Sequence, residues 1–269
     1  MVGTVCGFRT YAARAILPAV LAMVLAWPAS AGAGQSARLT AALRPERLGQ
    51  GTTIEFGFTI ATTHGQVPSP LTGLELYYPA NLGLATSGLG LETCTAAILQ
   101  STGPEGCPSQ SLMGYGTGLV EVPFGPILLH ETTQTTIFMA PLRHGRLGLI
   151  FYAIGIAPVA AEIVFPGLVL PANDPFGGDL AATIPLVPTL PGAPNAALVK
   201  LDSTLGPLGI TYYEHLHGRY YPYHPKGIIL PRTCPPGGFR FAAHLTFEDA
   251  THTNASTRVP CPREGRRRG

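Results

Sequence analysis

The densest group of chemically versatile side chains lies in the sequence TYYEHLHGRYYPYH, residues 211–224. His215 and His217 are two positions apart, so on an extended strand both side chains would point to the same face. Glu214 and His224 are close enough in sequence to complete a metal shell, because imidazole and carboxylate groups are common zinc ligands. This spacing suggests a metal site of Glu214, His215 and His217, and with it a metal-dependent hydrolase.

The same stretch is rich in tyrosine, which combines a flat apolar ring with a polar hydroxyl group. Such rings suit a binding platform for a carbohydrate or a peptide, but they equally suit an exposed hairpin that covers the edge of a sheet. Fold alone does not decide between these roles. The candidate ligand-binding residues are Tyr212, Tyr213, Tyr220, Tyr221 and Tyr223.

Other catalytic patterns have less support. His130 and Glu131 begin like the zinc motif HExxH, but the sequence HETTQ lacks the second histidine. The chain has no GxSxG sequence, which would mark the nucleophile of a serine hydrolase. We therefore predict no catalytic residue and no cofactor, and nothing in the sequence supports an enzyme beyond the metal hypothesis.

The N-terminus has the three-part pattern of a secretory signal peptide. Two arginines precede an apolar run over residues 15–27, and small residues follow up to Ala33. The run is shorter than the roughly 20 residues that a membrane-spanning helix needs. We therefore predict that residues 1–33 are a signal peptide, cleaved after Ala31 or Ala33, and that the secreted chain keeps no membrane span. The alternative is an uncleaved segment that tethers the protein to a membrane.

Loss of the signal peptide removes Cys6 and leaves an even number of cysteines, which in an exported chain predicts disulfides. Four cysteines allow three pairings, and their short spacing favours bonds between nearest neighbours. A zinc site fits less well because the pairs are not CxxC knuckles. The four residues are Cys94, Cys107, Cys234 and Cys261.

The balance of charge argues against one class of partner. The formal net charge is +2, and loss of Arg9 and Arg14 with the signal peptide leaves 15 basic and 15 acidic residues. Proteins that bind nucleic acid present a basic footprint, so we predict no nucleic-acid partner. Residues 263–269 contain three consecutive arginines and are predicted to be a disordered tail.

The rest of the chain alternates apolar with polar residues, most clearly over residues 51–60 and 239–247. One or two helical turns are expected between Thr93 and Gln100. The run GYGTG is expected to be a glycine-bent strand rather than a phosphate-binding loop. Two strands buried on both faces are expected over 147–156 and 159–165. Further strands are expected over 74–78, 112–122, 126–140, 181–187, 196–202 and 228–230.

About a dozen short strands separated by Gly/Pro turns point to an antiparallel sandwich or barrel. We predict an all-β antiparallel β-sandwich, immunoglobulin-like or jelly-roll-like, with one short helix at most. No linker divides the chain, so residues 34–262 are expected to form a single domain. The alternative is a split into two domains between Pro171 and Pro194.

Three stretches resemble a group of uncharacterised exported proteins of GC-rich actinobacteria: LYYPANLGLATSGLGLETC, CPSQSLMGYGTGLVEVPFGP and LPRTCPPGGFRFAAHLTFEDATHTNASTRVPCP. The resemblance covers most of the chain after residue 33 and implies a disulfide-bonded β-domain, but it brings no activity and no catalytic residue. The recurring positions are Cys94, Cys107-Pro108, Ser111, Gly114, Cys234-Pro235 and Cys261-Pro262.

The sequence as a whole therefore predicts a secreted or cell-surface protein with a structural or ligand-binding role. The expected ligand is a carbohydrate or a protein. The alternative is the metal-dependent hydrolase that uses His215, His217 and Glu214.

Overall fold

A computed structural model describes residues 3, 34–63, 65–83, 92–157 and 160–262. Residues 32–269 form a unit of their own, separate from residues 1–31, and the fold described below belongs to this unit. Apart from residue 3, the predicted signal peptide and the predicted Arg-rich tail lie outside the described residues.

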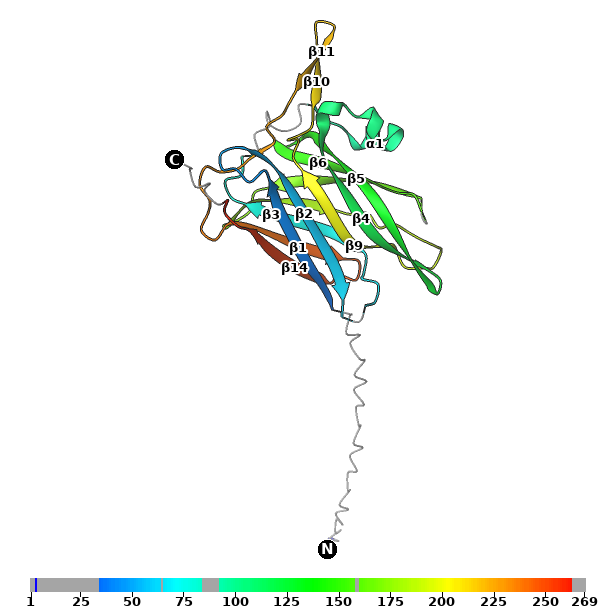
Figure 1. Ribbon diagram of the computed structural model, residues 1–269. Coiled ribbons are helices and arrows are strands. Elements are labelled where there is room, and N and C mark those ends of the chain that lie inside the picture. The colour runs from blue at the N-terminus through cyan, green and yellow to red at the C-terminus, as the bar shows by residue number, and fades with distance from the viewer. Residues whose placement is uncertain (1–2, 4–33, 64, 84–91, 158–159, 263–269) are drawn as a thin grey trace. The chain divides into compact units, whose positions relative to one another are not determined.

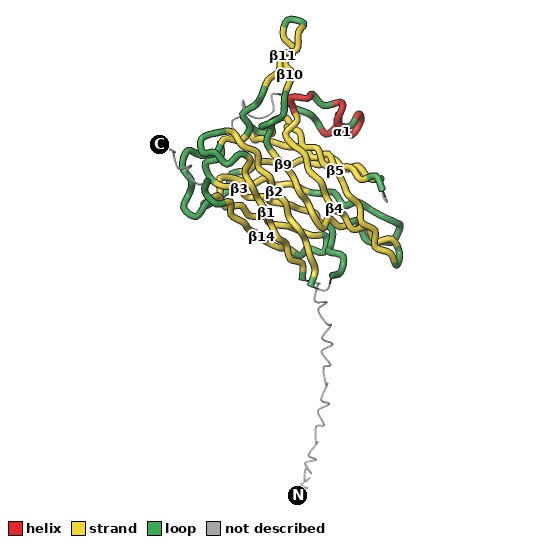
Figure 2. Tube along the Cα trace, viewed as in Figure 1, coloured by secondary structure: helices red, strands yellow, loops and turns green. Residues whose placement is uncertain are grey.

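The described chain is almost entirely antiparallel β-structure (Figures 1 and 2). Its helices are α1 (Ala96–Thr102) and two 3₁₀ turns, Pro104–Gly106 and Ser109–Ser111. The strands are β1 (Gln35–Arg44), β2 (Gly51–Thr62), β3 (Leu71–Pro79), β4 (Leu112–Phe124), β5 (Ile127–Arg143), β6 (Arg146–Gly155), β7 (Ala161–Leu170), β8 (Phe176–Thr183), β9 (Ala197–Leu205), β10 (Tyr212–Leu216), β11 (Arg219–Tyr223), β12 (Ile228–Ile229), β13 (Phe239–Phe247) and β14 (His252–Val259).

Twelve of these strands make one nearly closed sheet. Its order is β1-β2-β9-β4-β5-β6-β7-β8-β3-β13-β14, and β12 pairs with β2 away from this path. The first and last strands of the order, β1 and β14, lie side by side (Figure 1). Gln35 Nε2 of β1 donates a hydrogen bond of 2.9 Å to the hydroxyl of Thr251, just before β14. Strands β10 and β11 form a separate two-stranded sheet.

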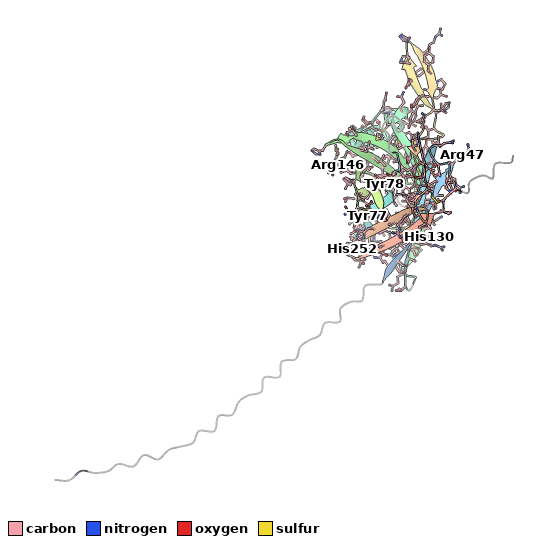
Figure 3. All side chains as sticks on the ribbon, turned by 90° about the vertical axis from the view of Figure 1, so that its left-hand side faces the viewer. Arg47, Tyr77, Tyr78, His130, Arg146 and His252 are labelled. Atoms are coloured by element: carbon pink, nitrogen blue, oxygen red, sulfur yellow. A yellow bond between two sulfur atoms is a disulfide. The ribbon has the colours of Figure 1, made fainter. Side chains whose placement is uncertain are left out.

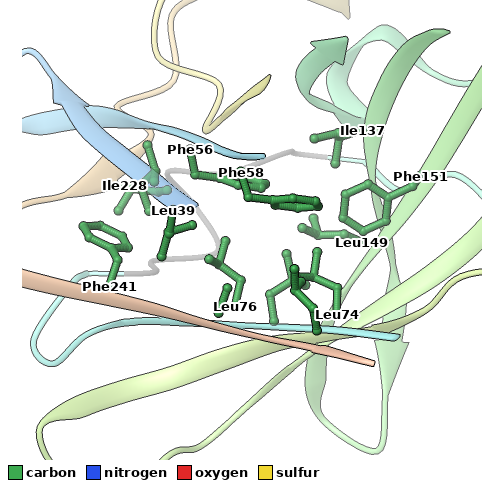
Figure 4. Packing of buried hydrophobic residues seen from close by; sticks show 14 of the residues in the cluster. Leu39, Phe56, Phe58, Leu74, Leu76, Ile137, Leu149, Phe151, Ile228 and Phe241 are labelled. Atoms are coloured by element: carbon green, nitrogen blue, oxygen red, sulfur yellow. The ribbon is translucent and has the colours of Figure 1, made fainter. Parts of the chain in front are cut away.

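The core lies on the inner face of this sheet because successive side chains of a strand point to opposite faces. In β13 the side chains of Phe239, Phe241 and Leu245 are fully buried, whereas Arg240 between them is exposed. Figure 4 shows Phe241, Leu39 and Ile228 gathered in the same interior as Phe56 and Phe58. The alternation predicted for residues 51–60 and 239–247 is therefore confirmed.

A smaller apolar cluster lies under α1, and it buries part of the other face of the sheet. Leu99 of α1 and Cys94 pack against Phe138 of β5 and Tyr152 of β6. The helix begins where Thr95 caps it, because the Thr95 hydroxyl accepts a hydrogen bond from the backbone N–H of Ile98. The helical turns expected near Thr93 to Gln100 are confirmed, with the helix beginning at Ala96 and ending at Thr102.

The expected end of a strand before Pro166 is wrong, because β7 continues through this proline to Leu170. The pairing of β7 with β8 begins only at Gly167, so at Pro166 only β6 lies alongside the strand. A proline is tolerated where a strand has an unpaired side. The expectation that β7 is buried on both faces is also wrong, since most of its residues are half-buried.

The run GYGTG is the glycine-bent strand that the sequence predicts, since it lies inside β4. The structure explains the first of its glycines: a Cβ at Gly114 would collide with the backbone carbonyl of Thr204 on β9. Close approach of two strands therefore requires glycine at this position.

The buried face of β13 gives a direct test of this architecture. We expect Phe241→Ala to lower the free energy of unfolding by about 3 to 5 kcal/mol, because it leaves a cavity in a fully packed region. The neighbouring substitution Arg240→Ala, on the exposed side of the same strand, should change it by less than about 0.5 kcal/mol. Urea unfolding measures both, and equal losses would contradict the assignment of faces.

Candidate functional site

The histidine- and tyrosine-rich stretch folds as the hairpin β10–β11, which stands away from the main sheet (Figures 1 and 3). Its strands pair in register from Tyr212 with Tyr223 to Leu216 with Arg219. His217 and Gly218 form the turn, both with positive φ, 50° and 77°. Two consecutive residues with positive φ fit the tight turn that a two-stranded hairpin favours.

This geometry corrects the prediction that His215 and His217 share a strand face. Strand β10 ends at Leu216, so His217 lies in the turn and not on the strand. Glu214 and His215 are neighbours on β10 and point to opposite faces. Among the residues that the structure describes, no group of three or more His, Cys, Asp or Glu side chains is placed to hold a metal ion.

The two outer histidines of this stretch have other neighbours. The His215 ring lies 4.8 Å from the ring of Tyr220, centroid to centroid, across the hairpin. The Nδ1 atom of His224 lies 3.4 Å from the hydroxyl of Thr211. The predicted metal ligands are thus distributed over two faces and a turn.

The five tyrosines do not form one platform either. Tyr212 is fully buried, and its hydroxyl donates a hydrogen bond to the backbone carbonyl of Leu112. Tyr223, opposite Tyr212, is half-buried. Tyr213 and Tyr220 lie on one face of the hairpin and Tyr221 on the other, because successive residues of a strand alternate. Tyr212 is therefore a structural anchor rather than a ligand contact.

The four cysteines lie as nearest-neighbour pairing predicts. Cys94 pairs with Cys107, with 5.3 Å between their Cα atoms, and Cys234 pairs with Cys261 at 5.8 Å. The first bond holds the segment that carries α1, and the second joins the chain before β13 to the chain after β14. Both are structural ties at the periphery of the sheet.

A cavity of about 140 Å³ lies inside the sheet, and the sequence does not predict it. Phe56 and Phe58 of β2, Leu74 of β3 and Phe151 of β6 form part of its wall and point into the interior in Figure 4. Part of the wall is built from smaller side chains, because Thr135 of β5 lies opposite Ala153 of β6. Small inward residues leave the space that larger ones would fill.

The lining of the cavity contains one carboxyl group among apolar residues. Glu131 is only 4% exposed, and of the described residues that line the cavity it is the only one with a charged side chain. Thr133, Thr135 and Ser203 add hydroxyl groups to the lining. Glu131, Thr133 and Thr135 alternate along β5, which turns all three inward. A buried carboxyl group selects hydrogen-bond donors and cations.

The chain that follows β8 contributes to the lining of the cavity. Leu186 lines it and is also 39% exposed. The preceding and following residues, Pro185 and Val187, also belong to the lining.

The sequence contained one indirect signal for this site. Glu131 belongs to the sequence HETTQ, where the missing second histidine argued against a zinc motif. The alternation Glu131, Thr133, Thr135, Ile137 would have placed the carboxyl group on the buried face of a strand. A buried acidic residue is unusual enough to mark a site.

No protein-family model, curated protein or solved structure matches this chain. Among the helices of the residues that the structure describes, none is both long and apolar enough to cross a membrane.

The anchoring role of Tyr212 can be measured. We expect Tyr212→Phe to lower the free energy of unfolding by about 1 kcal/mol, because it removes the hydroxyl that donates to Leu112. The matched control Tyr213→Phe changes an exposed ring and should have no effect. Urea unfolding at neutral pH gives both values, and similar values for the two variants would argue against the anchor.

The same tyrosine predicts a dependence on pH. Burial, and then the nearby Tyr115 and Tyr223, raise the pKa of Tyr212 above its usual value of 10. A raised pKa in the folded state means that the stabilisation is fully present below pH 10 and is lost as the pH rises through the folded pKa. The stability difference between the wild type and Tyr212→Phe should therefore shrink only above pH 10, and a decline below pH 9 would contradict the burial of this side chain.

Proposed function

We propose that this protein is an exported binding protein whose interior cavity holds a small, largely apolar ligand. The cavity of about 140 Å³ carries this proposal. An apolar cavity of about 150 Å³ in another protein stays dry and binds benzene, so this space suits a ligand with a benzene-sized apolar group. The role is the ligand-binding one expected from the sequence, at a different place in the chain.

A cavity of this size would be costly for a folded protein if nothing filled it. At about 24 cal/mol per Å³, the cost would be on the order of 3 kcal/mol, a large part of the net stability of a domain. A ligand that fills the space would restore the missing contacts. A cavity retained for binding accounts for this cost, whereas an accidental void would be filled by larger side chains at Ala153 or Ala182.

Export is the second part of the proposal. It is supported by the predicted signal peptide and by the two cysteine pairs at disulfide distance, because disulfides persist in oxidising compartments. We further propose that the nearly closed sheet is a sandwich, with the halves around β2 and β13 pressed together over the shared core.

Glu131 suggests that the proposed ligand carries a hydrogen-bond donor. Its carboxyl group would accept hydrogen bonds from an amine or a hydroxyl group on an otherwise apolar molecule. Glu131 lies opposite Val120 of β4. It is two positions closer to the β4–β5 turn than Thr133 is. The polar head of the ligand would therefore lie at Glu131, and its apolar part would lie against Phe58 and Phe151.

Filling the cavity tests the proposed function. We expect the wild type to bind benzyl alcohol in titration calorimetry, and Ala153→Phe to abolish binding because the new ring occupies the cavity. The matched control Ala181→Phe makes the same change at a half-buried alanine outside the lining of the cavity and should leave binding intact. Binding by Ala153→Phe, or no binding by the folded wild type, would reject the proposal.

The preference for a donor group is tested separately with benzylamine and benzyl alcohol. We expect the wild type to bind the amine more tightly, and Glu131→Gln to lose about tenfold in affinity for the amine while the alcohol is little affected. Glu121→Gln is the control, since Glu121 lies on β4 and pairs with His130 at 3.4 Å without lining the cavity. An equal loss for both ligands would mean that Glu131 only maintains the structure.

A further inference from the structure

Two arginines lie side by side on the outer face of the sheet. Arg240 of β13 is directly opposite Arg258 of β14 in the antiparallel register. Both are exposed, whereas Phe239 and Phe241 beside Arg240 are fully buried. Residues directly opposite on antiparallel strands have Cβ atoms about 4.5 to 5.5 Å apart, and like charges in such a pair are destabilising. The fold therefore keeps two positive charges at close range although they repel.

No acidic side chain offsets this repulsion within the described part of the chain. On the same outer surface of the sheet, Nε of Arg44 lies 3.3 Å from Oε2 of Glu55, so an arginine with a carboxylate partner has a clear example in this fold. Neither Arg240 nor Arg258 forms an ion pair or a side-chain hydrogen bond with a described residue. Their guanidinium groups are therefore available to a ligand.

Both arginines line a hollow of about 570 Å³ at the disulfide Cys234–Cys261. We call this hollow the arginine pocket. Its volume lies within the range of about 300 to 1,000 Å³ that is usual for small-molecule sites, so it has room for more than a single ion. The polar side chains of its described lining all carry hydrogen-bond donors and none is acidic. They are Asn81, Thr233, Arg240 and Arg258.

A tight turn fixes one wall of the arginine pocket. The backbone N–H of Gly238 donates a hydrogen bond of 3.0 Å to the carbonyl of Pro235. Between them, Gly237 has a positive φ of 77°, and a Cβ at this residue would come within 2.8 Å of Nη1 of Arg258. The guanidinium group of Arg258 thus lies against an ordered turn. Groups that are already ordered lose less conformational freedom when a ligand binds.

We propose that the arginine pocket binds a phosphate monoester. Guanidinium groups form bidentate, charge-assisted hydrogen bonds with phosphate oxygens. A phosphate monoester has a charge of about −1.5 to −2 at pH 7, which matches the two arginines. A carboxylate has a single negative charge and would leave one arginine without a counterion. A bound phosphate group would also offset the repulsion between Arg240 and Arg258, because both would contact the same anion.

This site is separate from the interior cavity of the proposed function. Arg240 and Arg258 point away from the core, because they alternate with the buried residues of β13 and β14. Neither residue belongs to the lining of the cavity. The arginine pocket therefore adds a second ligand of different chemistry, and it does not depend on the first.

Titration calorimetry of the full chain at pH 8 tests the proposal with glycerol 3-phosphate as the probe. We expect the wild type to bind this probe at least about tenfold more tightly than acetate at equal ionic strength, because the phosphate group has about twice the charge. Arg240→Gln and Arg258→Gln should each weaken binding of the probe by about tenfold, since each removes a charge-assisted contact.

Two further variants control for charge and for folding. Arg219→Gln removes an exposed arginine of β11 that lies outside the arginine pocket, and it should leave the affinity unchanged. Arg258→Glu places opposite charges across β13 and β14, an arrangement that stabilises a sheet. We expect this variant to keep the urea midpoint of the wild type or to raise it, and to lose binding of glycerol 3-phosphate.

The phosphate group could belong to a soluble molecule or to a lipid, and vesicles distinguish these sources. If the source is a lipid, adding phosphatidic acid to phosphatidylcholine vesicles should raise the bound fraction of the wild type and of Arg219→Gln, but not that of Arg258→Gln. Binding of glycerol 3-phosphate without this increase would indicate a soluble ligand. The apolar N-terminal run is common to all variants, so the differences between them report the arginine pocket.

Three results would overturn the proposal: no binding of either phosphate probe, equal affinity for acetate, or a loss in Arg219→Gln as large as in Arg258→Gln. Binding of benzyl alcohol by Arg258→Gln should equal that of the wild type, because Arg258 does not line the cavity. A failure of the arginine pocket would then leave the cavity function intact, and a failure of the cavity function would leave the arginine pocket intact.

Discussion

The inward burial of one apolar face on strand after strand is the constraint on which the whole fold depends. A strand such as β13, with Phe239, Phe241 and Leu245 on one side, hides that side only if the sheet curls around it. The sheet does so until β1 and β14 lie side by side. Large rings fill the interior beside these two strands. Around Ala153 of β6 the inward residues are smaller, and the same curl encloses a space there.

The parts of the fold that could be predicted from sequence are those where the alternation is strong and local. Residues 51–60 and 239–247 carry large apolar residues at every second position, so both strands were recognisable from the pattern alone. The short helix was recognisable because Gly103 and Pro104 end it. The nearest-neighbour cysteine pairing also followed from spacing, because a hairpin brings the residues before and after it together.

The rest depended on information that no single stretch contains. Strand β1 was missed because alanines occupy two of its inward positions and weaken the alternation around Leu39 and Leu43. The tyrosines of β10–β11 looked alike in sequence, but only tertiary contact decides that Tyr212 is buried and Tyr220 is exposed. The cavity corresponds to no sequence motif. Its lining comes from strands that are far apart in sequence, and their side chains together leave a space. A carboxyl group on the inner face was the one local sign of it.

The loop between β8 and β9 places a proline at every third position, at residues 185, 188, 191 and 194. Proline has no backbone N–H, so this stretch offers few of the donors through which an added strand could extend the sheet. An uncharged, apolar stretch on the surface of a β-protein would otherwise promote aggregation by strand pairing between copies. Because of these prolines, the loop can expose apolar side chains to solvent without offering the backbone donors to which a strand of a neighbouring copy could hydrogen-bond.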